Sequence, residues 1–214
     1  MVISNRVILI GGAPRIGKSQ LAKIIAARLG GHIASTDSIR SAAKRMVKDE
    51  SSPIFRINRH NAMSESEWLD YFSNNPDAVL ADMNEESRAT WPAVRSFIRS
   101  FEDDDLVHVV EGVHLLPDLV GELSIDTQNI IFVGNTFQEH ASNVINHAKD
   151  NPTIDWMMGA GFSDEKIMTQ AQFSIDMSQY FKTEAKKYGY KYIELGNSSY
   201  PQNLQKIAKT FPRP

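Results

Sequence analysis

RVILIGGAPRIGKSQLAKIIAARLGG, residues 6–31, is the stretch of this chain that decides its fold. Residues 6–10 form an apolar, β-branched run, which predicts a buried strand. Residues 18–29 place leucine and isoleucine at helical spacing, and the glycine pair 30–31 predicts the end of that helix. The start of the chain is therefore expected to run from a strand, through a glycine-bounded turn, into a helix.

The turn itself matches the pattern G-x-x-x-x-G-K-[ST]. Its members are Gly12, Ala13, Pro14, Arg15, Ile16, Gly17, Lys18 and Ser19. Such a turn points successive backbone N–H groups inward, and the following helix adds its positive end, which suits a chain of phosphates. Lys18 supplies a point charge for the β- and γ-phosphates, and the Ser19 hydroxyl is a ligand for Mg²⁺. A chance match in a turn is the alternative, but the flanking strand and helix favour a phosphate-binding loop for ATP.

Composition excludes several other kinds of protein. The 214 residues carry a formal net charge of −3 and contain no cysteine, which rules out disulfides, thiolate catalysis and cysteine-bound zinc. The sequence contains no lysine- or arginine-rich run of the kind that predicts a nucleic-acid surface. No stretch approaches the roughly 18 to 20 apolar residues that span a bilayer, and the N-terminal residues do not resemble a signal peptide. We therefore expect a cytoplasmic protein that binds a small molecule, without a nucleic-acid or membrane partner.

The rest of the chain continues the alternation of strands and helices. Four further strands are predicted, at residues 32–36, 106–112, 129–134 and 190–195. Helices between them indicate an α/β domain over residues 1–214, with a parallel five-stranded sheet covered on both faces. Residues 50–100 are expected to form a helical insert that binds the acceptor; it starts with a loop at 51–61 and is interrupted near 74–76 and Pro92. Residues 150–166 are expected to form a lid, mostly loop.

Polar residues follow the predicted second strand, where loops of a parallel sheet converge on a ligand. Asp37, in the segment STDSIR, is placed to accept or orient the proton of an acceptor hydroxyl. An N-cap of the next helix is the structural alternative for this aspartate, and it does not exclude catalysis. Arg40 is a candidate for holding an acidic substrate; a surface arginine is the alternative.

The third strand ends in VVEGVHLLP, residues 109–117. Glu111 closes an apolar strand beside the phosphate-binding loop, which is the expected place for a carboxylate that organises Mg²⁺. Gly112 permits close approach of the backbone. His114 is a candidate substrate contact, with a structural role as the alternative.

Other features have simpler interpretations. DLVG, residues 118–121, imitates a GTPase switch, but no N-K-x-D segment accompanies it. His140 and His147 are read as surface histidines rather than a metal pair. Trp156, Met157 and Met158 either cover a ligand or pack locally. The apolar face of the long helix, which carries Phe173, Ile175, Met177 and Phe181, is expected to be core.

Taken together, GGAPRIGKS, STDSIR and VVEGVHLLP resemble 2-phosphoglycerate kinase and related small-molecule P-loop kinases. SRATWPAV, residues 87–94, and YIELGNSSYPQNLQKI, residues 192–207, extend this resemblance over most of the chain. The resemblance implies a sheet of order 2-3-1-4-5. It also implies roles for individual residues: Gly12, Gly17, Lys18 and Ser19 bind ATP, Asp37 acts on the acceptor hydroxyl, Glu111 organises Mg²⁺, Arg40 and Arg88 grip the substrate's negative group, and Gly196, Asn197 and Ser198 lie beside the adenine.

The chain departs from this family in its lid. Kinases of this kind bring lid arginines over the transferring phosphoryl group, but this sequence has no arginine between Arg99 and Arg213. The lid region offers only weaker substitutes, namely Lys149, Lys166, His140 and His147. Other candidate sources of the missing charge are Arg15, Arg56, Arg59 and a partner subunit.

The sequence thus predicts an ATP- and Mg²⁺-dependent kinase that phosphorylates a hydroxyl of a small anionic metabolite, such as 2-phosphoglycerate or a sugar acid. A nucleoside or a phosphosugar is an alternative acceptor. An ATP-binding regulator with weak or no transfer activity is the alternative from another class, supported by the missing lid arginines. A slow ATP hydrolase is a third reading.

Overall fold

The computed structural model describes residues 6–101, 105–196 and 200–211. Its centre is a five-stranded sheet in which every neighbouring pair is parallel, with the order β2-β3-β1-β4-β5. The strands are β1 (Val7–Gly12), β2 (His32–Ser35), β3 (His108–Gly112), β4 (Ile130–Gly134) and β5 (Lys191–Glu194). The predicted α/β class and the 2-3-1-4-5 order are confirmed.

The middle of the sheet is its most buried part. β1 pairs with β3 from Val7 opposite His108 to Gly11 opposite Gly112, and with β4 on its other side. All residues of β1, β3 and β4 are buried, as expected for parallel strands with helices on both faces. The register therefore brings the ends of β1 and β3 together at one edge of the sheet.

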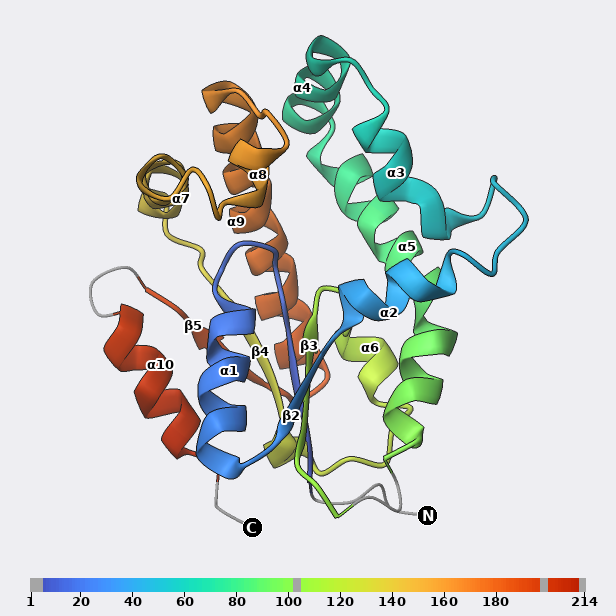
Figure 1. Ribbon diagram of the computed structural model, residues 1–214, viewed down its shortest axis with the longest axis vertical. Coiled ribbons are helices and arrows are strands. Elements are labelled where there is room, and N and C mark those ends of the chain that lie inside the picture. Colours follow the sequence, from blue (N-terminus) through green and yellow to red (C-terminus); the bar gives the residue numbers. More distant parts are fainter. Residues whose placement is uncertain (1–5, 102–104, 197–199, 212–214) are drawn as a thin grey trace.

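Helices cover both faces of the sheet (Figure 1). α1 (Lys18–Leu29) and α10 (Tyr200–Lys209) pack side by side on one face. α9 (Asp164–Lys187) packs on β4 and β5 from the other, beside α5 (Pro76–Arg99) and α6 (Pro117–Val120). The α9 residues expected in the core are all buried, which confirms that prediction: Phe173, Ile175, Met177 and Phe181.

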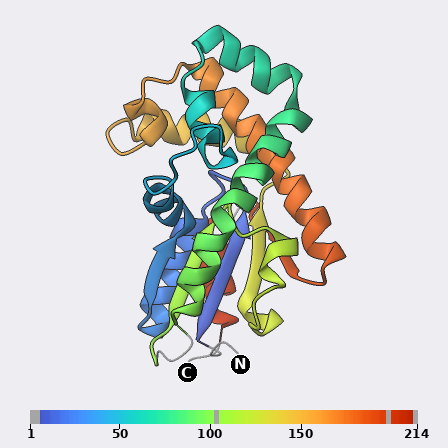
Figure 2. The same ribbon diagram turned by 90° about the vertical axis from the view of Figure 1, so that its right-hand side faces the viewer.

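A short 3-10 helix (Thr127–Asn129) precedes β4, and the other helices stand above the carboxyl ends of the strands (Figures 1 and 2). They are α2 (Thr36–Ala43), a short 3-10 turn (Pro53–Phe55), α3 (Arg56–Asn61), α4 (Glu65–Asn74), α7 (Glu139–Asp150) and α8 (Trp156–Gly159). α4 packs against α9, where Phe72 meets Phe173 with ring centroids 5.7 Å apart. Helices from both halves of the chain thus stand around the edge at which the predicted phosphate-binding loop, residues 12–19, lies.

Two sequence expectations about the helices are wrong, and a third needs one addition. Residues 56–61 are helical rather than loop. Pro92 lies inside α5 without ending it, because the buried side chains of Trp91, Val94 and Ile98 anchor the helix on both sides of the proline. The lid contains a helical turn, α8, whose N-cap Asp155 accepts hydrogen bonds from the N–H groups of Met157 and Met158.

A second hydrophobic cluster, separate from the main core, lies around the predicted lid. Its members come from α7, α8 and the first half of α9: Ala141, Val144, Ala148, Met157, Ile167, Ala171 and Ile175. Within the described ranges, none of the helices combines the length and apolarity that crossing a membrane requires.

Candidate active site

The phosphate-binding loop has the backbone geometry that its glycines predict. Gly12 has φ 141°, and a Cβ atom there would lie 2.0 Å from the Val133 carbonyl oxygen, so only glycine fits against β4. Gly17 is the N-cap of α1 with φ 98° and offers no side-chain cap to the helix. No side chain of the N-cap residue therefore competes with an anion for the amide groups at the start of α1.

Lys18 is the buried cation of this loop. Its side chain is only slightly exposed, and its Nζ donates to the Ala13 carbonyl oxygen at 2.5 Å. Burial lowers the pKa of Lys18, while the charges of Glu111 and Asp37 raise it in part. One ammonium group is therefore within electrostatic reach of both candidate carboxylates, and it lies where a polyphosphate would neutralise it. These residues fit ATP.

Ser19 and Glu111 make the contact expected of a magnesium site. The Ser19 hydroxyl donates to Oε1 of Glu111 at 3.0 Å, across the gap between α1 and β3. Glu111 is buried at the penultimate position of its strand. A hydroxyl and a carboxylate are oxygen ligands of the kind that Mg²⁺ prefers, so these two residues fit that ion.

Asp37 lies in the first turn of α2, which follows β2. The N-cap of α2 is Ser35, whose hydroxyl accepts the N–H of Asp37, so the N-cap interpretation of Asp37 is wrong. The carboxylate is 70% exposed, and its Oδ1 lies 3.6 Å from Nδ1 of His114. An exposed carboxylate with one neighbouring imidazole remains accessible to an incoming hydroxyl.

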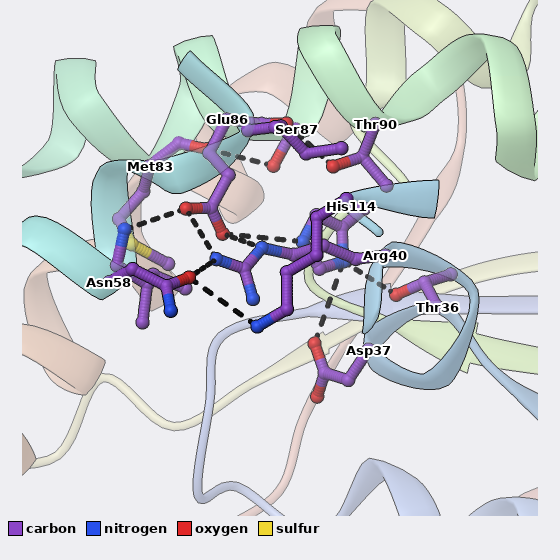
Figure 3. A network of polar contacts seen from close by, with 12 residues as sticks. Thr36, Asp37, Arg40, Asn58, Met83, Glu86, Ser87, Thr90 and His114 are labelled. Carbon is purple, nitrogen blue, oxygen red and sulfur yellow. Dashed lines mark hydrogen bonds and ion pairs between the residues drawn. The ribbon is translucent and has the colours of Figure 1, made fainter. Parts of the chain in front are cut away.

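Arg40 is buried and paired, not a surface arginine (Figure 3). Its Nε lies 2.6 Å from Oε1 of Glu86 and its Nη2 3.1 Å from Oε2. The same Nη2 donates to Oδ1 of Asn58 at 2.9 Å, and Lys44 reaches that oxygen at 3.5 Å. The two cations converge on one neutral amide oxygen.

Glu86 connects the insert to this network (Figure 3). It is fully buried on α5 and also accepts the backbone N–H of Ile57, in α3, at 2.7 Å. Its Oε1 lies 3.7 Å from Nε2 of His114. The sequence analysis missed Glu86, although it falls on the buried stripe of α5 between Met83 and Thr90, where a glutamate is unusual.

His114 is completely buried between the two carboxylates. Its Nδ1 is 2.9 Å from the Thr36 hydroxyl, which fixes the ring beside Asp37. Gly112, with φ 152°, permits this arrangement, because a Cβ atom there would lie 1.7 Å from Oγ1 of Thr36. These contacts favour the structural role for His114 over a direct substrate contact. The ring nevertheless lies next to Asp37, the candidate acceptor residue.

The phosphate-binding loop also contacts the lid. Arg15, with φ 61°, extends its Nη2 to Oδ2 of Asp155 at 2.6 Å. His140 is buried, so its interpretation as a surface histidine is wrong; its pKa falls to about 4, through burial first and the charge of Arg15 second. His147 is exposed, and its Nδ1 is 4.0 Å from Oδ2 of Asp155.

Several known proteins are similar to this chain in sequence. A "2-phosphoglycerate kinase" of Methanococcus maripaludis is 25% identical over 94% of this chain and 62% of its own length. The protein of that name from Methanocaldococcus jannaschii is 27% identical over 62% of this chain and 42% of its own length, and that from Methanothermobacter thermautotrophicus is 29% identical over 58% and 40%. This chain is similar to archaeal 2-phosphoglycerate kinases. No protein-family model matches the sequence.

The similarity to 2-phosphoglycerate kinases has a clear limit, because the matches span 37–62% of the lengths of these relatives. The structure groups the residues of the predicted site unevenly. Ser19 contacts Glu111, and the charges of Glu111 and Asp37 both act on Lys18. Arg40 and His114 lie beside Asp37 (Figure 3).

Arg88 does not join this group. Its Nη1 pairs with Oδ2 of Asp118 at 2.6 Å, and residues two apart on a helix, such as Glu86 and Arg88, point to opposite sides. Gly196 is part-buried at the end of the segment after β5, with Phe137 as the neighbour that a Cβ would meet. Asn197 and Ser198 lie outside the described residues. The substrate role of Arg88 and the adenine-side roles stay predictions.

Proposed function

We propose that this protein is an ATP- and Mg²⁺-dependent kinase that phosphorylates a hydroxyl group of a small anionic metabolite, such as 2-phosphoglycerate or a sugar acid. The observation that carries the proposal is the contact between the Ser19 hydroxyl and Oε1 of Glu111 at 3.0 Å, next to the buried Lys18, whose pKa the charges of Glu111 and Asp37 both raise. The printed names of the archaeal relatives support the reaction class.

Each residue of the predicted site has a defined task in this proposal. ATP would supply the phosphoryl group and Mg²⁺ a counter-charge for it. Lys18 and the loop amides bind the phosphates, and Ser19 with Glu111 holds the ion. Asp37 receives the proton of the acceptor hydroxyl as the bond from that oxygen to the γ-phosphorus forms and the bond from phosphorus to the β-phosphate oxygen breaks. Positioning and charge neutralisation, rather than covalent catalysis, lower the barrier.

The acceptor's negative group is assigned to the cations beside Asp37. Arg40 is oriented by two oxygens of Glu86, and Lys44 lies on the same side of Asn58. Asn58 presents a neutral oxygen to both, at a place where a phosphate or carboxylate oxygen would bind more strongly than an amide. This arrangement supports an acidic acceptor over a neutral one.

A coupled assay tests the proposal directly. ADP release is measured with ATP and Mg²⁺, alone and with 2-phosphoglycerate, glycerate, gluconate or a nucleoside added one at a time. The expected result is ADP release that requires one of the acidic acceptors. A thermal-shift screen of the same compounds with a non-hydrolysable ATP analogue gives independent evidence, because a ligand of the folded state raises the melting temperature.

The contacts made by the two lysines near the predicted lid support a second candidate, an ATP-binding regulator. Lys149 pairs with Asp164, and Lys166 lies over the rings of Trp68 and Phe162. Both lysines thus have partners other than a transferring phosphoryl group. A regulator would bind the ATP analogue, release no ADP with any compound of the panel and retain a protein partner in pull-downs. ADP release without any acceptor would instead indicate hydrolysis.

A further inference from the structure

The phosphate-binding loop and the lid share one guanidinium group. The side chain of Arg15 is 14% exposed, and its Nη2 lies 2.6 Å from Oδ2 of Asp155, a carboxylate that is 1% exposed. The two residues are 140 positions apart in the sequence. This contact joins the loop after β1 to the N-terminus of α8.

The other cations considered for the transferring phosphoryl group are engaged elsewhere. Arg56 pairs with Asp82 and Glu85, and Arg59 donates to the backbone oxygens of Glu50 and Ser52. In the lid region, Lys149 and Lys166 are held by Asp164 and by aromatic rings.

The two histidines of that region do not fill the gap. His140 is neutral at pH 7 because its pKa is lowered to about 4, and His147 is exposed at the far side of Asp155. Arg15 is the candidate that already lies within the loop.

The chemistry of the pair permits exchange of partner. Asp155 uses its Oδ1 to cap α8, accepting the N–H of Met157 at 3.0 Å and of Met158 at 3.4 Å, and uses its Oδ2 for Arg15. If Arg15 leaves, the cap remains. A guanidinium group has five N–H donors, and this contact occupies one nitrogen, so Arg15 has donors to offer a second anion.

We propose that the Arg15 side chain recognises the terminal phosphoryl group of the bound nucleotide, and that Asp155 is the counter-ion from which this phosphoryl group takes it. The inference rests on the proposed function, because it requires ATP in the loop. A dianionic phosphoryl oxygen set attracts a guanidinium more strongly than one carboxylate does. Arrival of ATP would therefore loosen the contact between the loop and α8, and loss of the γ-phosphate would restore it.

Two substitutions isolate the side chains from the backbone. Arg15→Gly removes the guanidinium at a position whose φ of 61° glycine adopts without strain, so the loop keeps its shape. Asp155→Asn removes the charge but keeps an oxygen that caps α8. Arg95→Gln and Asp164→Asn are matched controls, because each breaks a single exposed ion pair elsewhere, with Glu122 and with Lys149.

The test is calorimetric titration of a non-hydrolysable ATP analogue and of ADP into each variant with Mg²⁺. Arg15→Gly is expected to weaken the analogue about tenfold or more while ADP changes by less than about threefold, the effect of losing one charge-assisted contact to the terminal phosphate. Asp155→Asn is expected to strengthen the analogue severalfold, and that gain disappears in the double variant. Both controls are expected to bind like the wild type.

Other results overturn the inference in distinguishable ways. Equal loss of both nucleotides in Arg15→Gly, or no loss, contradicts the role of Arg15 but leaves the proposed function standing. Unchanged analogue binding in Asp155→Asn contradicts the exchange. Failure of the wild type to bind either nucleotide overturns the inference and the proposed function together.

Fluorescence adds a second readout. Trp156, next to Asp155, is 57% exposed, whereas Trp68 and Trp91 are buried. The analogue should change the emission of the wild type and leave that of Arg15→Gly unchanged at saturation; equal changes in the two proteins contradict the exchange. A thermal melt of each variant shows whether it is folded.

Discussion

Ser19, at the end of the phosphate-binding loop, takes its partner from the end of a neighbouring strand, whereas Arg40 and Arg15 take theirs from helix α5 and from the N-cap of α8, far along the chain. Ser19 meets Glu111 where β3 ends beside β1, a position fixed by the parallel register. Arg40 depends on Glu86 in the insert, and Arg15 on Asp155 in the lid. In the proposed site, the nucleotide half is thus held by the sheet, whereas the acceptor half and the predicted lid are each held by an ion pair, one between α2 and α5 and one between the loop and the N-cap of α8. Substitutions should therefore disturb the two halves differently.

The largest effect is expected on the nucleotide side, from Lys18→Met. Methionine keeps the buried length of the side chain and removes the ammonium group. Acceptor-dependent ADP formation should fall by about a thousandfold or more, since a preorganised charge at the reacting group is lost. The melting temperature should change little. Lys23→Met, an exposed position on the same helix, is the control and should retain activity. Near-normal turnover of the Lys18 variant would contradict the role of the phosphate-binding loop in the reaction.

Asp37→Asn probes the point where the two halves meet. The amide keeps the size of the side chain but cannot take the hydroxyl proton, so transfer should fall by about a hundredfold or more. Binding of the ATP analogue, measured by calorimetry, should persist, because the loop is intact. Asp70→Asn, an exposed change on α4, controls for the lost charge. Parallel loss of binding and transfer would argue that Asp37 supports the loop rather than the acceptor.

Glu86→Gln tests the acceptor half by itself. The change leaves Arg40 buried without its anion, so the free energy of unfolding should drop by about 3 kcal/mol. The KM for the acceptor should rise, with the affinity for the ATP analogue unchanged. Glu85→Gln, whose partner is the half-exposed Arg56, should cost less than about 1 kcal/mol. Similar losses in both variants would show that the burial of Glu86 has no special role.

The smallest effect is expected at the base of the lid, from pH. The pKa of His140 is lowered to about 4 in the folded protein, so below its ordinary value of 6.5 the unfolded chain binds a proton that the folded chain does not. Stability should therefore fall by roughly 2 kcal/mol between pH 7 and pH 5. Urea unfolding of His140→Phe should lack this component, and His147→Gln should keep it. A wild-type protein whose stability does not change over this range contradicts the burial of His140.

The sequence was sufficient wherever a local pattern fixes a local structure. The bounds of α1 match the expected helix, and the loop before it adopts the glycine geometry that the spacing requires. Glu111 could be placed because a parallel strand must end beside its neighbour.

Pairs that are distant in sequence could not be found in this way. The sequence around Glu86 does not predict its pairing with Arg40, and the sequence around Asp155 does not predict its pairing with Arg15. Both pairs form only because the whole fold brings distant segments together. Pro92 is a second case in which tertiary packing decides. Its tendency to break a helix is overcome by the burial of its neighbours in α5.

The separate hydrophobic cluster of the lid has a consequence for how the molecule can change over time. Because Val144, Met157 and Ile167 belong to a cluster of their own, local opening of this region should cost less free energy than unfolding of the sheet. Substitutions confined to this cluster can therefore change how readily the region opens without repacking the sheet that carries the predicted phosphate-binding loop.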